Sequence, residues 1–448
     1  MFLCVMNLLQ ILGYQIIRKY IVLPLIGLNL CISSCRPVPV GSTATENGKI
    51  LDSLYHAKDF FRMKTSYDGL ESRLSEYEKL YYGSVLKNLF NEPGESLSAI
   101  AELEQRFGKK ITDSTRSALW QLQLSNYIKR LDYRNAARVS RLILGNYTAY
   151  LDSATLSDIR NELNIWKALE KVPAVKASVN TDHRLLLTLD KAGLKNTTVR
   201  FGSDSVDFIF DTGANFSVIR RSVAEKAGLK IMETDFLVGT ITGEQVKSRL
   251  AVAPQIHMGS ITWHNVVFLV FDDNSLTIPQ IDYHIYGILG FPEIRSLREI
   301  RISKDNILTV PARPTAGQPQ NLYFDGLMPI IAARHGGDTL AFSFDSGAST
   351  THLYPKFYEK YQRAIDTLYT ITSIAFGGAG GVQEFTGVEN VALDLELGDK
   401  YGQLDNIALI VDERYTEKRG IFGNLGQDFI GLFGGFAINF ETSSLWFE

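Results

Sequence analysis

The chain has 448 residues, a formal net charge of −3 and a hydrophobic share of 45%. A chain of this length and composition can bury more than one core, and its charge gives no electrostatic basis for binding nucleic acid. Its seven histidines are dispersed, and none has the spacing of a metal-ligand motif such as His-Glu-x-x-His. We therefore expect no metal, no cofactor and no nucleic-acid partner.

The first 35 residues have the composition of an export signal. A basic pair, Arg18 and Lys19, precedes an apolar run over residues 21–32, and small residues follow the run. This order is typical of a secretory signal rather than of a membrane-spanning helix. The tetrapeptide Ile32-Ser33-Ser34-Cys35 resembles a bacterial lipobox, which implies lipidation of Cys35. A simple anchor and a signal cleaved without lipidation are the open alternatives.

Cysteine usage agrees with this interpretation, because Cys4, Cys31 and Cys35 all lie in the leader. Cleavage before Cys35 would leave no thiol able to form a disulfide within the chain. Residues 36–48 are rich in Pro, Gly, Ser and Thr and are interpreted as a tether. We expect a protein of the bacterial cell envelope, exported and held to a membrane by a lipid on Cys35, at the periplasmic or outer-membrane face.

Residues 49–171 are predicted to be helical. Apolar residues recur there at helical spacing in three stretches, residues 51–61, 97–107 and 124–131. Breaks at 91–94 and 109–110 divide the region into five to seven helices. Residues 131–137 resemble the inter-helix turn of a tetratricopeptide-like hairpin, in a single copy. Either an array of hairpins that binds a protein partner or, more simply, a helical cap is compatible with this pattern.

The remaining chain carries one motif twice. Asp211 lies in Phe208-Ile-Phe-Asp-Thr-Gly-Ala214, and Asp345 lies in Phe342-Ser-Phe-Asp-Ser-Gly-Ala348. A lone Asp-Thr/Ser-Gly occurs by chance in roughly one of every few chains of this length. Here the motif occurs twice, with apolar residues before both copies and similar residues after both. An ordinary turn that happens to occur twice explains this much less well.

The repeat extends downstream of both aspartates. Gly287-Ile-Leu-Gly290 follows the first copy and Gly423-Asn-Leu-Gly426 follows the second, at nearly equal distances. A short alternating segment comes after each, at residues 300–308 and 436–446, as a final strand would give. The sequence therefore predicts two equivalent units, residues 173–314 and 318–448.

The paired Asp-Thr/Ser-Gly-Ala motifs, each with its apolar-Gly element, resemble the aspartic proteases, and most closely the bacterial retropepsin-like proteins with two lobes in one chain. The resemblance covers residues 173–448. It implies a multidomain fold, with an α-helical N-terminal domain followed by two mainly-β lobes related by pseudo-two-fold symmetry. It maps the catalytic pair onto Asp211 and Asp345. It also maps the residues that support the pair onto Thr212, Gly213, Ser346 and Gly347.

The chemistry of such a site requires two adjacent carboxyl groups. Because like charges a few ångströms apart cannot both ionise, the pair shares one proton. The ionised member takes a proton from water while the protonated member polarises the scissile carbonyl, so hydrolysis needs no covalent intermediate. The resemblance implies an aspartic endopeptidase that cleaves extended peptides. The alternative is a peptide-binding or scaffold lipoprotein that has kept the fold without catalysis.

Each unit should also provide a hairpin flap over the substrate. Residues 238–244 and 376–382 are the glycine-rich candidates, although ordinary hairpin turns would look the same. The flap residues expected to contact a peptide backbone are Gly239, Thr240, Ile241, Gly377 and Gly378.

Two departures from the family pattern stand out. The flap tyrosine of pepsin-like enzymes has no counterpart in residues 238–244, which favours the retropepsin-like branch. Asn424 occupies the position that Ile288 holds in the first unit. A second alignment, through Ile421-Phe422-Gly423, restores the apolar residues, and both alignments stay open.

Overall fold

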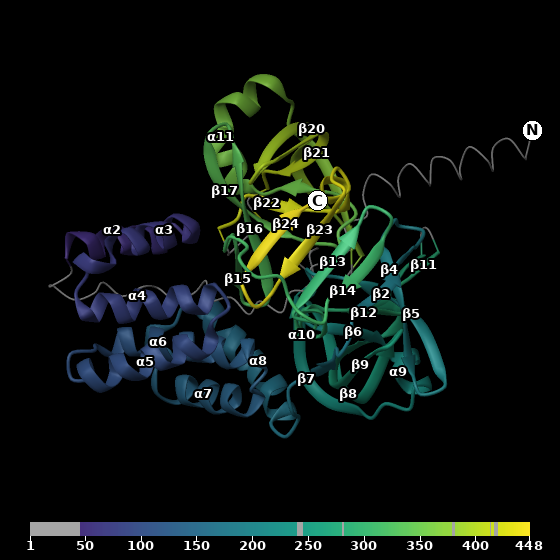
Figure 1. Cartoon of the computed structure of the whole chain (residues 1–448), viewed down its shortest axis with the longest axis horizontal. Helices are drawn as coiled ribbons and strands as arrows, with labels where there is room; N and C mark the ends of the chain where they lie inside the picture. The colour runs from purple at the N-terminus through teal and green to yellow at the C-terminus, as the bar shows by residue number, and fades with distance from the viewer. Residues whose placement is uncertain (1–44, 240–244, 280–281, 379–380, 413, 416–419) are drawn as a thin grey trace, which may run out of the picture.

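The computed structural model describes residues 45–239, 245–279, 282–378, 381–412, 414–415 and 420–448 (Figure 1). The predicted signal segment with its Cys35 lies outside the described residues. The helical region begins earlier than predicted, because helix α2 (Glu46–His56) starts inside the residues that we assigned to the tether. The Thr45 hydroxyl caps this helix by accepting a hydrogen bond from the Gly48 amide (3.0 Å), and Glu78 accepts hydrogen bonds from the amide and hydroxyl of Thr45.

The helical region consists, among the described residues, of seven α-helices, within the predicted range. After α2 come α3 (Phe60–Leu70), α4 (Glu76–Leu89), α5 (Pro93–Phe107), α6 (Asp113–Lys129), α7 (Tyr133–Asn146) and α8 (Ser153–Leu169). The predicted breaks fall between α4 and α5 and between α5 and α6. Local chemistry fixes several starts: Ser75 and Glu78 form a capping box for α4, and Pro93 opens α5.

Residues 173–314, which we call the first β region, form a nine-stranded sheet. The order β1-β9-β6-β12-β5-β4-β8-β7 places β7 at one end, and the short β3 pairs with β4. The strands are β1 (Lys176–Ser178), β3 (Thr188–Leu189), β4 (Lys195–Phe201), β5 (Asp204–Phe210), β6 (Ser217–Arg220), β7 (Ile231–Gly239), β8 (Gln245–Met258), β9 (Ile261–Phe271) and β12 (Gly287–Leu289). Helices α9 (Arg221–Lys226) and α10 (Phe291–Ser296) follow β6 and β12, and β10 (Thr277–Ile278) pairs with β11 (Tyr283–His284).

Residues 318–448, the second β region, form an eight-stranded sheet in the order β15-β16-β17-β22-β18-β21-β20-β19. The strands are β15 (Leu322–Asp325), β16 (Met328–His335), β17 (Asp338–Phe344), β18 (His352–Leu353), β19 (Thr372–Gly378), β20 (Gly381–Leu397), β21 (Lys400–Ile410) and β22 (Gly423–Leu425). Helices α11 (Pro355–Leu368) and α12 (Gln427–Ile430) follow β18 and β22.

The two sheets repeat one set of pairings around the aspartates. Strand β5, which ends just before Asp211, pairs in parallel with β12, and β12 pairs in antiparallel with β6. Strand β17, which ends just before Asp345, pairs in the same two senses with β22 and β18. Asn424 pairs with Ser343 as Ile288 pairs with Ile209, so the first of the two alignments considered above is correct.

A third sheet joins the two β regions. Its order is β2 (His183–Leu186), β14 (Ile307–Val310), β13 (Glu299–Ser303), β23 (Gly435–Asn439) and β24 (Ser444–Phe447). Each segment predicted as one final strand is instead a hairpin of two strands. In the first hairpin Asn306 adopts a positive φ of 60°, which lets the chain reverse within the apolar alternation. The contact between β13 and β23 buries Ile300 against Ile438.

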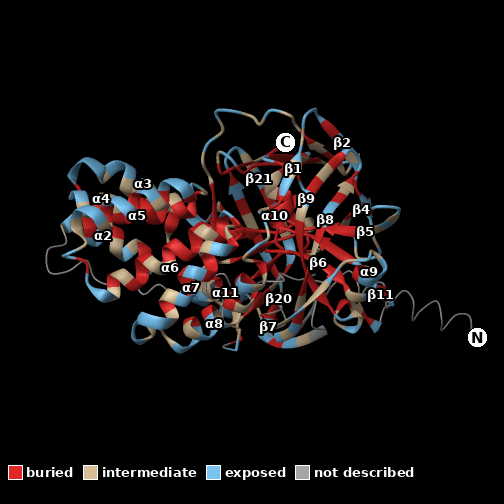
Figure 2. Cartoon of the chain, turned by 90° about the horizontal axis from the view of Figure 1, so that it is seen from below, coloured by how far each residue is buried: buried red, intermediate tan, exposed pale blue. Residues whose placement is uncertain are grey.

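The helical region packs against both β regions rather than standing apart (Figures 1 and 2). One buried cluster runs from α6, α7 and α8 into the first β region, and another joins α2 to α6 with the second. At the second contact, the ring of Tyr323 lies 5.5 Å from that of Phe60 and 4.9 Å from that of Phe61, measured between centroids. These aromatic contacts fix the helices to the sheet.

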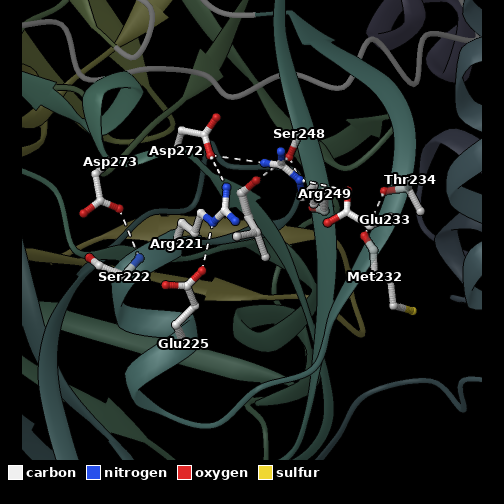
Figure 3. Close-up of polar contacts among 11 residues, drawn as sticks. Arg221, Ser222, Glu225, Met232, Glu233, Thr234, Ser248, Arg249, Asp272 and Asp273 are labelled. Atoms are coloured by element: carbon white, nitrogen blue, oxygen red, sulfur yellow. Dashed lines mark hydrogen bonds and ion pairs between the residues drawn. The ribbon is translucent and has the colours of Figure 1, made fainter.

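A surface network of charges braces the β7–β8 hairpin (Figure 3). Arg249 of β8 contacts Glu233 of β7 (3.3 Å) and Asp272 after β9 (3.1 Å). Asp272 also contacts Arg221 of α9 (3.4 Å), which pairs with Glu225 (2.9 Å). Because the acidic partners are mostly exposed, each pair contributes about 1 kcal/mol or less. The network therefore orients the hairpin base more than it stabilises the fold.

Candidate active site

Asp211 and Asp345 begin equivalent loops at the ends of β5 and β17. The Asp211 amide donates to the Leu289 carbonyl and the Asp345 amide to the Leu425 carbonyl, each at 3.0 Å. Each carboxylate then accepts from its own loop: Gly213 N–H donates to Asp211 Oδ1 (2.7 Å), and Gly347 N–H to Asp345 Oδ1 (2.8 Å). Both side chains are therefore held in a fixed direction by backbone donors.

The two loops lie in direct contact through their glycines. A Cβ atom on Gly213 would lie 2.5 Å from Cγ of Asp345, and one on Gly347 would lie 2.2 Å from Cγ of Asp211. No side chain fits at such distances, so glycine is required at both positions. Each carboxyl group packs against the opposite loop, and the two carboxyl groups are hydrogen-bonded to each other.

The residues that follow the aspartates link the two loops. The Thr212 amide donates to Ser346 Oγ and the Ser346 amide donates to Thr212 Oγ1, both at 3.0 Å. The hydroxyls donate onward across the interface, Thr212 Oγ1 to the Phe344 carbonyl (3.2 Å) and Ser346 Oγ to the Phe210 carbonyl (2.9 Å). All these groups are buried, so the network excludes water beneath the aspartates.

Burial changes the acidity of the pair. Both aspartates are 1% exposed. Burial raises the pKa of Asp211 well above its usual range, with a further increase from the charge of Asp345, and it raises the pKa of Asp345. Because the two groups are hydrogen-bonded, they titrate as a unit, and one proton is retained where isolated aspartates would have lost it. The arrangement can therefore supply a general acid and a general base together.

Asn424, which the sequence showed only as a departure from the pattern, belongs to this site. Its side-chain oxygen accepts from Ser343 Oγ (2.5 Å), and its amide lies 3.4 Å from Asp345 Oδ2. Burial of a polar side chain is thus compensated by polar neighbours. In the sequence, the sign of this role was an asparagine at a position where the first unit has an isoleucine.

A second group near the loops had no sequence signal. Gln427, the first residue of α12, donates from Nε2 to the Ser346 carbonyl (2.6 Å). Its Oε1 accepts from the Nζ atom of Lys195, which comes from β4 of the first β region. Burial lowers the pKa of Lys195 to about 8. The contact joins residues far apart in the chain, so only the folded structure reveals it.

The predicted flap residues are partly described. Gly239 closes β7 and pairs with Gln245, whereas Thr240 and Ile241 lie outside the described residues. Gly377 and Gly378 end β19 and pair with Val382 and Gly381. Both predicted hairpins are therefore formed by paired strands at the ends of their sheets. No contact among the described residues tests whether their tips cover the aspartates.

The described residues offer neither a metal site nor a membrane-spanning helix. They contain no cluster of three or more His, Cys, Asp or Glu side chains arranged to hold a metal ion. Within the same residues, no helix combines the length and the apolar character needed to cross a membrane.

Two interlocked Asp-Thr/Ser-Gly loops with a buried carboxyl pair are the arrangement that the resemblance to aspartic proteases predicted. In agreement, residues 197–292 match the aspartyl protease family. This segment contains Asp211 and the Gly287–Gly290 element. The predicted resemblance to the aspartic proteases is confirmed for this part of the chain.

Comparison with curated proteins found no match. Among solved structures, a retropepsin-like aspartic protease from Rickettsia conorii is 17% identical, with 31% of this chain and 95% of that chain covered and a TM-score of 0.21. Basic 7S globulin from soybean is 10% identical and conglutin gamma, a basic 7S globulin from lupine seeds, is 12% identical. For both, 60% of this chain and 95% of the other are covered, with a TM-score of 0.38. At these TM-scores the structural similarities add no argument about function.

Proposed function

We propose that the protein is an aspartic endopeptidase that hydrolyses extended peptide segments, with Asp211 and Asp345 as its catalytic pair. The observation that carries the proposal is the contact between two buried, hydrogen-bonded aspartates, one from each repeated loop. A protein that only binds peptides gains nothing from two carboxyl groups forced together, because their burial costs free energy.

In the proposed reaction, water attacks the scissile carbonyl carbon. The ionised member of the pair accepts a proton from that water, and the protonated member donates a hydrogen bond and then its proton to the carbonyl oxygen. Collapse of the resulting diol breaks the C–N bond: the leaving nitrogen takes up a proton from the pair, and one diol hydroxyl returns a proton to the pair as the carbonyl re-forms. Thr212, Gly213, Ser346 and Gly347 hold the two carboxyl groups in the geometry that this exchange needs.

The proposal includes an arrangement of the whole chain. Residues 173–314 and 318–448 are the two lobes, related by a pseudo-two-fold axis that passes between the aspartates, as the repeated pairings of β5 and β17 suggest. The β7–β8 and β19–β20 hairpins are the flaps. Residues 49–171 form a helical domain, which provides a surface for a protein partner or substrate.

The decisive experiment uses the soluble chain that begins at Arg36, which contains every described residue. A random peptide library is incubated with the wild type, Asp211→Asn and Asp345→Asn from about pH 3 to 8, a range that covers the titration of such a pair. Cleavage that disappears in both variants and is blocked by a statine-type inhibitor would support the proposal. Cleavage that persists in either variant would overturn it. The absence of both cleavage and binding of the statine-type inhibitor would favour the alternative, a non-catalytic peptide-binding or scaffold lipoprotein.

We also propose, from the sequence alone, that the protein is exported in a bacterium and anchored by a lipid on Cys35, at the periplasmic or outer-membrane face. Residues 36–44 would then continue the tether up to α2. Labelling cells with a fatty-acid analogue tests this. The wild type should carry the label and sediment with membranes, whereas Cys35→Ala should lose both properties. Equal labelling of the two proteins would refute the lipid anchor.

A further inference from the structure

A cavity of about 570 Å³ lies where the helical region meets both β regions. Lys129 and Arg130 line it from the end of α6, Arg295 and Arg298 from and just after α10, and Glu441 from the loop after β23. Its volume is in the range of small-molecule binding sites. It lies apart from Asp211 and Asp345, neither of which lines it. The cavity is therefore a separate candidate site.

The charge of the cavity is unbalanced. Four basic residues and one acidic residue, Glu441, line it, and the Glu441 carboxylate is already paired with Arg298 at 2.6 Å. Among the described residues, no carboxylate lies within ion-pair distance of Lys129, Arg130 or Arg295. Arg130 and Arg295 therefore give the cavity a positive potential that favours an anion.

Arg295 is the group that most needs such a partner. Its Nη1 atom donates to the Lys129 carbonyl, and it makes no other hydrogen bond within the described part of the chain. Because a guanidinium has five N–H donors in a planar arrangement that suits a carboxylate or phosphate, Arg295 keeps donors for a ligand in the cavity that it lines. Partial burial lowers the pKa of Arg295 to about 10, because a cation that loses water without gaining a counter-charge is less stable.

Burial of the Lys129 ammonium group has a similar free-energy cost. It is 1% exposed, and its Nζ atom donates to the Asn88 carbonyl (2.6 Å) and to the Phe324 carbonyl (2.7 Å). Burial lowers the pKa of Lys129 to about 7, although Asp325 partly opposes the effect. An anion in the cavity would offset the repulsion between Lys129 and Arg295.

The rest of the lining decides what kind of anion fits. Apolar residues complete the walls: Leu131, Ala174 and Val175 keep some exposed surface, whereas Phe291, Leu327 and Phe440 are 1–2% exposed. A ligand with a short apolar body would cover the exposed surface of Leu131, Ala174 and Val175, whereas a bare inorganic ion would leave it in water. A ligand with both an anionic group and a short apolar part is an organic carboxylate or phosphate.

We propose that this cavity binds a small organic anion, whose carboxylate or phosphate group is held by Arg295 and Arg130 and whose apolar part packs on Ala174 and Val175. Because its walls come from the helical region and from both β regions, the bound anion holds these parts together. This site is independent of the peptidase chemistry.

Calorimetric titration of the chain from Arg36 with hexyl phosphate, hexanoate, inorganic phosphate and hexanol tests the site. The charged hexyl compounds should bind more tightly than inorganic phosphate, and hexanol should not bind measurably. The stronger of the two charged compounds identifies phosphate or carboxylate as the preferred head group. Added salt should weaken binding, because the attraction is electrostatic. Equal binding of hexanol and the charged compounds would overturn the proposal, as would no binding of either charged compound.

Variants separate the site from general effects. Arg295→Gln should weaken hexyl phosphate binding by about tenfold or more, since a charge-assisted bond is lost. Arg130→Gln makes no change to hydrogen bonds among described residues, so it tests the site even if Arg295→Gln misfolds, and it too should weaken binding. The exposed Arg134→Gln on α7 is the matched control and should bind as the wild type. Unchanged binding in both Arg130→Gln and a folded Arg295→Gln would refute the site. Asp211→Asn should bind normally even if the proposed peptidase activity proves absent.

Discussion

Thr212 and Ser346 exchange hydrogen bonds, the amide of each donating to the hydroxyl of the other at 3.0 Å. Each hydroxyl also donates to a carbonyl of the opposite chain segment, that of Phe344 or Phe210. Neither loop can therefore keep its geometry without the other. The position of the aspartates depends on the association of the two β regions as much as on the local turns.

The first prediction concerns Ser346→Ala. The substitution leaves the buried Thr212 amide and Phe210 carbonyl without their partner, and such loss costs about 1–3 kcal/mol. The free energy of unfolding in urea should fall by that amount, and peptide cleavage should fall with it. Ser346→Thr should retain most of both properties, because the first loop already carries a threonine at the equivalent position.

The exposed Ser98→Ala on α5 serves as the control for Ser346→Ala, because its hydroxyl makes only a helical hydrogen bond to the Gly94 carbonyl. It should change stability by much less than Ser346→Ala. If Ser346→Ala were as stable as Ser98→Ala, the exchange of hydrogen bonds between the loops would not contribute to the fold.

The second prediction concerns the pH dependence of stability at the aspartate pair. Because burial raises the pKa of Asp211 and Asp345, the folded protein holds a proton that the unfolded chain has released. The resulting stability is fully present below the usual aspartate pKa of about 4 and is lost as the pH rises through the raised values. Asp345→Asn removes part of this loss. Between about pH 4 and 8 the free energy of unfolding should therefore fall less steeply for Asp345→Asn than for the wild type.

Urea unfolding of both proteins at several pH values checks this prediction. The exposed Asp399→Asn, in the turn after β20, is the control and should follow the wild-type profile. A stability difference between Asp345→Asn and the wild type that does not change with pH would mean that the pair is not protonated as proposed.

The sequence predicted what depends on local patterns. The helical spacing of residues 51–61 and the doubled Asp-Thr/Ser-Gly motif each determine their own surroundings, so the helices and the equivalent loops could be anticipated. The hairpins of the third sheet could not be anticipated. The alternation of apolar and polar residues over 300–308 predicts one strand, but the chain reverses at Asn306. The bond between Lys195 and Gln427 depends on which strands become neighbours, and no spacing along the chain encodes that.

The third prediction concerns the attachment of helix α8 to the β7–β8 hairpin. Asn161 donates to the Leu237 carbonyl (2.7 Å) and accepts from the Leu237 amide (2.8 Å), so it occupies the open edge of β7 as a neighbouring strand would. In Asn161→Ala the Leu237 amide should exchange with deuterium several-fold faster, corresponding to the loss of about 1 kcal/mol of local stability. If β7 belongs to the flap, KM for peptides should change as well.

The neighbouring Arg160→Ala is the control for this experiment, because Arg160 is exposed on the same helix. It should leave the exchange of Leu237 unchanged. Equal exchange in Asn161→Ala and the wild type would show that the side chain does not hold β7, and an unchanged KM despite faster exchange would argue against β7 as part of the flap.

The last prediction concerns Lys195, whose ammonium group reaches the Ser346 loop through Gln427. Because burial lowers the pKa of Lys195 to about 8, the unfolded chain binds more protons than the folded protein between about pH 8 and the usual lysine pKa of about 10.4. Stability contributed by this group therefore rises with pH across that window. Lys195→Met should abolish this contribution. In urea unfolding between about pH 7.5 and 10, the free energy of unfolding should rise more steeply with pH for the wild type than for the variant. The exposed Lys109→Met should keep the wild-type slope, and parallel profiles for Lys195→Met and the wild type would show that Lys195 is not buried in the folded protein.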